Sequence, residues 1–234
     1  MESMYQLQGK MAELRLRRET MVTERLVARG IRDARVLGAM RAIPRHQFVC
    51  GGQLEEAYED CPLPIGHGQT ISPPTMVALM LEALELRGHE RVLDVGTGSG
   101  YQAAVLGWLA RKVHSVEIIP ELAALAHSTL AGLGMENVSV VVGNGRSGLP
   151  NEGPFDAIVV AAGAPDVPPL LMHQLAEGGT LVMPVGGDSQ QELVRVRKQH
   201  GAITRESIRP CTFASLRGEP GRGTWQLPSI VRSS

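Results

Sequence analysis

Five short runs rich in Val, Ile and Leu follow one another through the middle of the chain, and helical patterns lie between most of them. The runs are residues 91–96, 112–118, 138–143, 155–163 and 180–186. Strands that are apolar along their whole length are typical of a parallel sheet covered on both faces. Since helices between parallel strands imply right-handed crossovers, we expect an α/β fold with a doubly wound, mostly parallel sheet.

The helical patterns have recognisable ends. Helices are predicted for residues 74–86, 101–110, 120–134 and 167–179. The third of them begins with a proline and ends at Gly134, as helices often do. Two later runs, 191–199 and 203–210, are expected to pair as further strands. The tail from Arg217, rich in Gly, Pro and Ser, is expected to be loosely held.

The chain before this pattern is predicted to be helical and then irregular. Residues 10–43 show two helical segments that are broken at Gly30, with Asp33 as a cap for the second. From Pro44 to Ser72 the chain is rich in Gly and Pro. Because so long a loop inside a compact domain is usually functional, we expect a helical N-terminal extension followed by a working loop.

Composition limits the partners of this protein. The formal net charge is −1 and aromatic residues make up 3%. A nucleic-acid partner is therefore not expected, because such proteins use basic surfaces and aromatic platforms. No window approaches the ~18 apolar residues of a membrane span, and the N-terminus lacks an apolar signal core. We expect a cytoplasmic protein without a membrane partner.

The cysteines point in the same direction. Cys50, Cys61 and Cys211 are odd in number, widely spaced and without a CxxC pair. Free thiols in a reducing compartment fit this pattern better than a disulfide framework or a zinc site. No metal is expected.

The sequence VLDVGTGSGYQ places three glycines where the first strand turns into its helix. Gly96, Gly98 and Gly100 allow a sharp turn and a close approach of backbone to a ligand at the carboxyl edge of the sheet. Glu117 ends the next strand about 20 residues later, where a ribose hydroxyl is bound in such folds. A tight turn that binds nothing is the alternative.

The residues around this loop favour a cationic cofactor. A dinucleotide fingerprint needs glycine at position 101, where this chain has Tyr101, and Asp94 would repel a pyrophosphate. S-adenosylmethionine carries a sulfonium and an ammonium group and no phosphate. We therefore expect it, rather than NAD, to be bound by Asp94, by Glu117 and by the loop residues Gly96, Thr97, Gly98, Ser99 and Gly100.

A third loop follows the strand at 138–143, in the sequence VVGNGRSG. Asn144 and Gly145 are expected at the same sheet edge as Asp94 and Glu117. An amide there can exchange hydrogen bonds with an adenine ring. A plain Asn-Gly turn is the alternative.

Taken together, these stretches resemble the protein-L-isoaspartate O-methyltransferases. The resemblance rests on the combination of PLPIGHGQTIS, GTGSGYQAAVL and VEIIPEL, and it extends over most of the chain. It implies a Rossmann-like methyltransferase fold with S-adenosylmethionine as cofactor. It also implies a repair enzyme that methylates the free carboxylate of L-isoaspartyl residues in damaged proteins and peptides. The ester then cyclises to a succinimide, which can reopen to aspartate.

The resemblance also implies residue roles in the TIS triplet. Ser72 corresponds to the family's active-site serine, and the backbone of Gln69, Thr70 and Ile71 would line the cofactor and the substrate. Two departures are visible: Gly143-Asn144-Gly145 replaces the family's usual G-D-G, and the tail beyond Cys211 matches poorly.

Ser72 followed by Pro73 is also a common helix start. We expect Ser72 both to cap the following helix and to hold the substrate carboxylate, which a helix N-terminus attracts through its N–H groups. Upstream, Asp60 either fixes the loop or is simply exposed, and His67 either touches substrate or is solvated.

Three other functions remain to be separated from this one. They are methylation of a different acceptor, a cofactor-binding scaffold without catalysis, and an NAD oxidoreductase. Base methyltransferases usually carry a D/N-P-P-Y/F motif after the fourth strand, where this chain reads AAGAPDVPP. We expect a single methyltransferase domain over residues 1–234, with a monomer favoured. Its parts are the N-terminal helices and substrate loop (1–75), the cofactor-binding core (76–210) and the tail (211–234).

Overall fold

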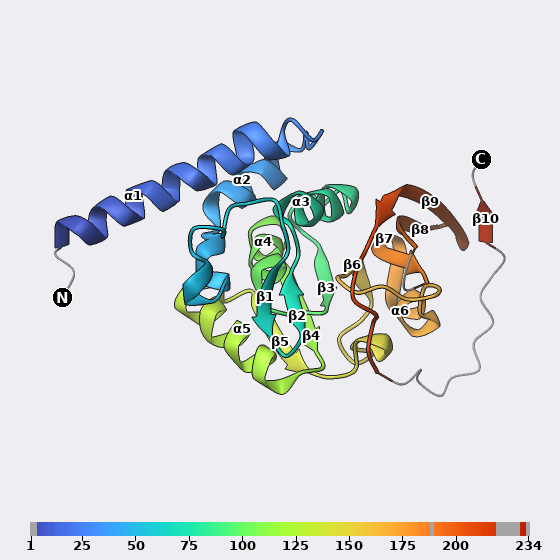
Figure 1. The fold of residues 1–234 in the computed structure, drawn as a ribbon. Coiled ribbons are helices and arrows are strands. Elements are labelled where there is room, and N and C mark those ends of the chain that lie inside the picture. Colours follow the sequence, from blue (N-terminus) through green and yellow to red (C-terminus); the bar gives the residue numbers. More distant parts are fainter. Residues whose placement is uncertain (1–3, 188–189, 219–229, 233–234) are drawn as a thin grey trace.

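An eight-stranded sheet forms the centre of the computed structural model, which describes residues 4–187, 190–218 and 230–232 (Figure 1). Its strand order is β10-β9-β8-β7-β6-β3-β4-β5. The strands are β3 (Arg91–Val95), β4 (Lys112–Glu117), β5 (Val138–Val142), β6 (Phe155–Val160), β7 (Leu175–Gly186), β8 (Gln191–Gln199), β9 (Ala202–Cys211) and β10 (Ile230–Arg232). Only β8 runs antiparallel to its neighbours, so the predicted mostly parallel sheet is confirmed.

The order of the strands reverses in the middle of the sheet. From β3 the chain adds β4 and β5 on one side and then returns to place β6 and β7 on the other. In an open α/β sheet, ligands bind outside the carboxyl ends of the strands at such a switch point. This point lies between β3 and β6.

Both faces of the sheet are covered, as the apolar strands predict. Alternate residues of β6 enter two different clusters of buried side chains: Ala157 and Val159 face one, and Ile158 and Val160 the other. The first cluster includes residues of α2 (Ala34–Ala42), α3 (Pro74–Ala83) and α4 (Tyr101–Leu109). The second includes residues of α6 (Pro169–Gln174). The helix α5 (Pro120–Gly132) packs on β4 and β5. The doubly wound fold is therefore confirmed.

The N-terminal segment forms helices, as predicted. Helix α1 (Met4–Thr20) continues into a π-helical turn at Met21–Leu26, and α2 follows after a break at Gly30, whose φ is +94°. Much of α1 projects from the body of the molecule (Figure 1). Asp33 caps α2 as expected, because its carboxylate accepts hydrogen bonds from the amides of Arg35 and Val36 at 2.7 and 3.0 Å.

The segment from Pro44 to Ser72 is more ordered than the sequence predicts. It contains 3-10 turns at Arg45–Phe48 and Gly51–Gln53 and a two-stranded hairpin, β1 (Leu63–Gly66) with β2 (Gln69–Ile71). The hairpin turn has positive φ at three consecutive residues, Gly66, His67 and Gly68. His67 is exposed there. The prediction of an irregular loop was wrong because strands of four and three residues, the first containing Pro64 and Gly66, are too short to show a recognisable alternation in the sequence.

Two other boundaries differ from the prediction. The helix expected at 167–179 is only α6, since the chain turns into β7 at Leu175, which pairs with Phe155 of β6. The tail from Arg217 lies mostly outside the described residues, but Ile230–Arg232 pair with β9 as β10. The predicted pairing of the two later strands is confirmed by β8 and β9.

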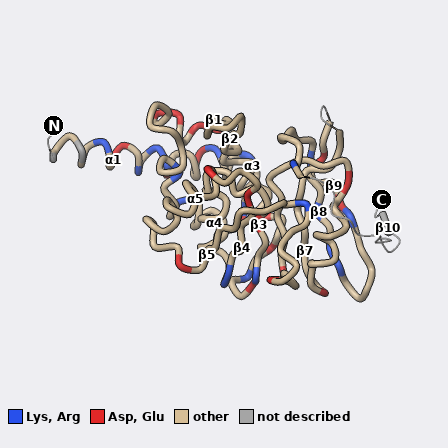
Figure 2. The backbone as a smooth tube through the Cα atoms, turned by 90° about the horizontal axis from the view of Figure 1, so that it is seen from below, with Lys and Arg blue, Asp and Glu red and all other residues tan. Residues whose placement is uncertain are grey.

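In Figure 2, Lys and Arg (blue) and Asp and Glu (red) occur as short segments scattered among longer stretches of other residues (tan). Of the helices in the described ranges, none is long and apolar enough to pass through a lipid bilayer.

The Asp33 cap gives a stability prediction. Asp33→Ala removes the acceptor for two amides of the first turn of α2, and we expect it to lower the free energy of unfolding by about 1 kcal/mol. Asp33→Asn keeps an acceptor oxygen and should stay within a few tenths of a kcal/mol of the wild type. Urea unfolding followed by circular dichroism measures both, and equal losses in the two variants would contradict the cap.

Candidate active site

A cavity lies at the carboxyl edge of the sheet, at the switch point between β3 and β6. Its empty volume is about 840 Å³, part of which is continuous with solvent. Its wall is formed by five segments, which are residues 69–72, 95–99, 116–119, 161–162 and 214–217. Gly145 and three residues of α3 and α4 complete the wall. The predicted meeting of separate loops at one edge is present in this structure.

The glycine loop adopts a backbone that other residues would strain. Gly96, Gly98 and Gly100 have φ of +90°, +54° and +92°. A Cβ on Gly98 would lie 3.2 Å from Ile65 of the hairpin, and one on Gly100 would lie 3.1 Å from Ala126. Gly96 lines the cavity together with Thr97, Gly98 and Ser99, whereas Gly100 starts α4 behind it. The glycines therefore let the loop turn sharply while the hairpin and α5 press against it.

Glu117 joins the glycine loop to the end of β4. Its carboxylate accepts hydrogen bonds from the amide of Gly98 at 2.8 Å and from the amide of Ile119 at 3.0 Å. The side chain is 6% exposed and lines the cavity. Two backbone donors thus fix the carboxylate in the cavity wall, where the sequence expects a group for the ribose. That ribose contact stays a prediction.

Asp94 lies one layer behind the cavity wall. It is fully buried, and its two carboxylate oxygens accept hydrogen bonds from Gln102 at 2.8 Å and from Ser115 at 2.7 Å. The Ser115 hydroxyl is also 2.5 Å from that of Thr97. Since Gln102 and Thr97 line the cavity and Asp94 does not, the structure places Asp94 behind cavity-lining side chains.

Burial sets the protonation of Asp94. It raises the pKa of this carboxyl to about 6, with a smaller contribution from the negative charge of Glu117, while the hydrogen bonds from Gln102 and Ser115 oppose the change. Near neutral pH the side chain is therefore mostly a carboxylate, a negative charge close behind the loop expected to meet a cationic ligand.

This pKa predicts a pH dependence of stability. The folded pKa lies above the ~3.9 of an unfolded chain, so the stabilisation from the bound proton is complete below about pH 4 and is lost as the pH rises through about 6. Asp94→Asn removes this loss. We expect the stability of the variant relative to the wild type to improve by about 1 kcal/mol between pH 5 and pH 8. Urea unfolding of the ligand-free proteins measures this, and a difference that does not change with pH would contradict it.

Asn144 and Gly145 occupy different positions relative to the cavity. Gly145 lines it, and a Cβ there would approach Val95 to 2.5 Å. The Asn144 side chain accepts a hydrogen bond from the amide of Arg146 at 3.0 Å and starts a 3-10 turn at Gly145–Ser147. Asn144 is thus placed as a turn residue beside the wall, and its contact with adenine stays a prediction.

Ser72 reaches the cavity but does not cap α3. The N-cap of α3 is Pro73, which makes no side-chain hydrogen bond, and Ser72 lies one residue earlier. The amide of Thr75 instead donates to the carboxylate of Asp60 at 2.9 Å. The capping prediction was wrong because Pro73 and Pro74 have no N–H, and the next amide already has a partner from a distant loop.

The first turn of α3 offers no amide to a substrate either. The amides of Met76 and Val77 donate to the carbonyl of Pro73 at 3.0 and 3.1 Å, and that of Thr75 is taken by Asp60. A carboxylate in the cavity would therefore not meet unpaired N–H groups of this helix, contrary to expectation. Within the described ranges the Ser72 hydroxyl has no hydrogen-bond partner. It is therefore able to form a hydrogen bond with a bound molecule, either as donor or as acceptor.

Two segments of the wall were missed by sequence reasoning. Ala161 and Ala162 follow β6 at the sheet edge, and residues 214–217 return along the same edge. The amide of Gly163 donates to Ala214, and that of Leu216 donates to Gly163, at 2.8 and 2.7 Å. The small residues of VVAAGAP after the fourth predicted strand were a usable signal, whereas the position of 214–217 depends on these long-range bonds.

The cavity wall combines two opposite charges with neutral residues. Its ionisable carboxylate and guanidinium groups are those of Glu117 and Arg217, and much of the rest is backbone and aliphatic side chains. Nowhere in the described chain do three His, Cys, Asp or Glu side chains gather as a metal ion would require.

Comparisons with known proteins extend these observations. A profile of the family described as Protein-L-isoaspartate(D-aspartate) O-methyltransferase (PCMT) matches residues 17–220. A protein-L-isoaspartate O-methyltransferase of Geobacter metallireducens is 51% identical over 208 residues, 88% of this chain and 96% of the relative. The corresponding protein of Trichlorobacter lovleyi is 49% identical over 220 residues, 94% of this chain and 100% of the relative.

Solved structures agree with the sequence relatives. One, named protein-L-isoaspartate O-methyltransferase, superposes with a TM-score of 0.79 at 29% identity over 87% of this chain and 67% of its own. Another, described as a beta-aspartate methyltransferase (PCMT) from Plasmodium falciparum, was solved in complex with S-adenosyl-L-homocysteine. Its TM-score is 0.76 at 30% identity, over 86% of this chain and 98% of its own.

Proposed function

The chain belongs to the protein-L-isoaspartate(D-aspartate) O-methyltransferase family, and from this premise we infer how its cavity holds donor and acceptor together. It is an S-adenosylmethionine-dependent enzyme that methylates the free carboxylate of L-isoaspartyl residues in damaged proteins and peptides. The methyl ester is the intermediate from which a succinimide, and then ordinary aspartate, can form. One observation carries the assignment to this cavity: the TIS segment and the glycine loop line it together.

The residues of the wall fit S-adenosylmethionine. Glu117 presents a buried carboxylate that suits the ribose hydroxyls, and the loop from Gly96 to Ser99 presents backbone where a side chain would block approach. Gly145 packs closely against Val95, where a Cβ would clash, and lines the same cavity. Asp94 adds negative charge behind Thr97 and Gln102, which favours a cation over a phosphate.

Few protein groups are needed for the chemistry. When bound, S-adenosylmethionine supplies an electrophilic methyl group on a positively charged sulfur. The acceptor is a carboxylate that is already ionised at neutral pH, because an unperturbed carboxyl titrates near ~4, so no general base is required. The wall formed by the described residues contains no histidine or cysteine, which agrees with this chemistry. The protein contributes alignment of the reacting atoms, which can be worth several kcal/mol.

We assign the orientation of the acceptor to Ser72. Ser72 is half-buried and lines the cavity, and its hydroxyl has no intramolecular partner in the described chain. It would donate a hydrogen bond to one oxygen of the isoaspartyl carboxylate and leave the other oxygen directed at the methyl group. The buried aliphatic residues Ile71 and Val77 also line the cavity and would limit water there, which helps a reaction in which a negative and a positive charge disappear.

We also propose a cytoplasmic monomer built as one methyltransferase domain. The free Cys50, Cys61 and Cys211 suit a reducing compartment. The joint lining of one cavity by residues from 69 to 217 supports a single domain. Size-exclusion chromatography with light scattering tests the monomer.

A peptide assay tests the proposed function. Purified protein with labelled S-adenosylmethionine should methylate an isoaspartyl peptide and leave the matching aspartyl peptide unlabelled, because the two differ in where the free carboxylate lies. Equal labelling of both would point to a different acceptor. No labelling, with S-adenosylhomocysteine still bound, would point to a cofactor-binding scaffold.

A second experiment tests Ser72. Ser72→Ala should lower kcat for the isoaspartyl peptide by ~10-fold or more, since an orienting hydrogen bond is lost. The Kd for S-adenosylhomocysteine and the free energy of unfolding should stay close to the wild-type values, because Ser72 caps no helix. Ser207→Ala on β9 is the matched control, because it makes the same substitution at a serine that does not line the cavity and whose hydroxyl donates to Glu192. Loss of S-adenosylhomocysteine binding in Ser72→Ala would show that Ser72 serves the cofactor instead.

A further inference from the structure

A carboxylate from the preceding loop closes the segment that carries Ser72. The Oδ1 atom of Asp60 accepts the hydrogen bond from the Thr75 amide, 15 positions further along the chain. Between these two residues lie the hairpin β1–β2 and then Ser72. The bond therefore ties together both ends of a loop that contains all four residues of the segment 69–72.

Asp60 is well placed to hold this loop. Its side chain is 10% exposed, and its other oxygen, Oδ2, lies 3.2 Å from Nε of Arg29. No other acceptor bonds the Thr75 amide in the described chain, and neither Pro73 nor Pro74 can donate. Because the hydrogen bond is partly buried and accepted by a carboxylate, we expect it to be stronger than a neutral one.

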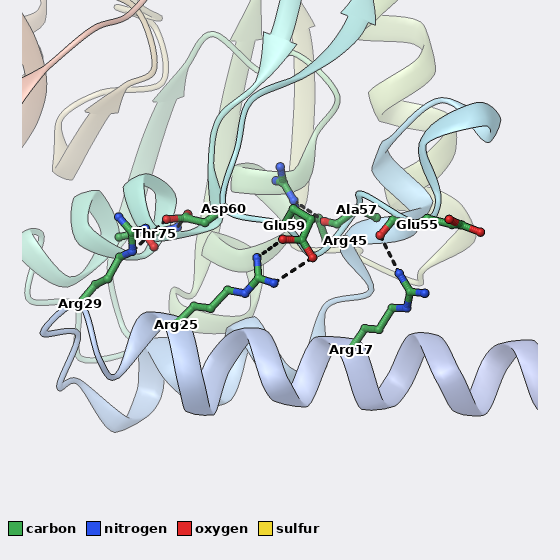
Figure 3. Close-up of polar contacts among 9 residues, drawn as sticks. All are labelled: Arg17, Arg25, Arg29, Arg45, Glu55, Ala57, Glu59, Asp60 and Thr75. Carbon is green, nitrogen blue, oxygen red and sulfur yellow. Dashed lines mark hydrogen bonds and ion pairs between the residues drawn. The ribbon is translucent and has the colours of Figure 1, made fainter.

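The loop that carries Asp60 is itself held from both sides. Figure 3 shows Arg17, Arg25 and Arg29 reaching from the N-terminal helical segment to residues 55–60. Arg17 donates to the carbonyl of Glu55 at 2.9 Å, and Arg25 pairs with the carboxylate of Glu59. From the other side the buried Arg45 donates to the carbonyl of Ala57 at 2.8 Å.

We propose that Asp60 is a positioning residue for the acceptor, acting through Ser72. By supplying the cap of α3, it spares the Ser72 hydroxyl from capping, and by closing the loop it holds that hydroxyl at the cavity wall. This inference rests on the proposed function, since it concerns the acceptor that Ser72 orients. The Arg29 guanidinium is more than half exposed, so its ion pair with Asp60 adds little, and the acceptor oxygen of Asp60 is the essential group.

The test compares variants that differ in this oxygen. Asp60→Ala should lower kcat/KM for the isoaspartyl peptide by ~10-fold or more, because small displacements of an orienting group are costly. Asp60→Asn keeps an acceptor and should retain activity within about threefold, as should Arg29→Ala. In all three the Kd for S-adenosylhomocysteine should stay within about twofold, since Asp60 does not line the cavity.

A matched control separates positioning from stability. Asp33→Ala removes a different N-cap, that of α2, and is expected to destabilise the fold to a similar extent. It should leave kcat/KM unchanged at a temperature where both variants are folded, as shown by S-adenosylhomocysteine binding. Should Asp60→Ala not fold, Asp60→Ser replaces it, with an expected loss between those of the Asn and Ala variants.

A double mutant shows whether the effect passes through Ser72. In a Ser72→Ala background, Asp60→Ala should lower kcat/KM by less than about twofold further, because the hydroxyl it positions is already absent. Additive losses would overturn the proposal, and so would a loss in Asp60→Ala no greater than that in Asp33→Ala. A wild-type protein that methylates no isoaspartyl peptide would instead refute the proposed function itself, and with it the acceptor role of Ser72.

Discussion

The turn from β3 into α4 is the constraint on which the rest of the site depends. Its three glycines have positive φ, and its amides are bonded to the neighbouring strand: Gly96 and Thr97 to the carbonyl of Val116, and Gly98 to Glu117. These bonds fix the ends of β3 and β4 as one edge. The hairpin touches the same turn, since Ile65 lies where a Cβ on Gly98 would fall. The glycine loop and the hairpin that precedes Ser72 are therefore in contact at this turn.

Three carboxylates near this edge have different tasks because their surroundings differ. Glu117 is held by two amides in the cavity wall, while Asp94 is fully buried behind it and bonded to Gln102 and Ser115. Asp60 lies away from the wall and closes the loop that carries Ser72. The loop that carries Ser72 is thus closed by a carboxylate outside the cavity wall, whereas Glu117 in the wall holds the glycine loop.

Much of the fold followed from local patterns. The apolar runs predicted the parallel strands, and Asp33 at the start of the second helical segment predicted the cap of α2, because both signals are local in the sequence. The glycine loop was located for the same reason, and Glu117 was located by its spacing from that loop, while their contacts with a cofactor stay predictions. Ser72 was given a cap that it does not make, since the real acceptor, Asp60, lies well outside any local window. The wall residues 214–217 were missed because their place depends on bonds to Gly163 at the end of β6.

The sequence by itself determined the fold class, the family and the glycine-rich turn after β3, because apolar periodicity and the φ freedom of glycine are properties of single segments. Only the tertiary structure decided which groups satisfy the first turn of α3, which carboxylate stands in the cavity and which behind it, and how the chain after β9 completes the wall. These depend on hydrogen bonds between residues far apart in sequence. Such bonds form only after the sheet has brought the strand ends together.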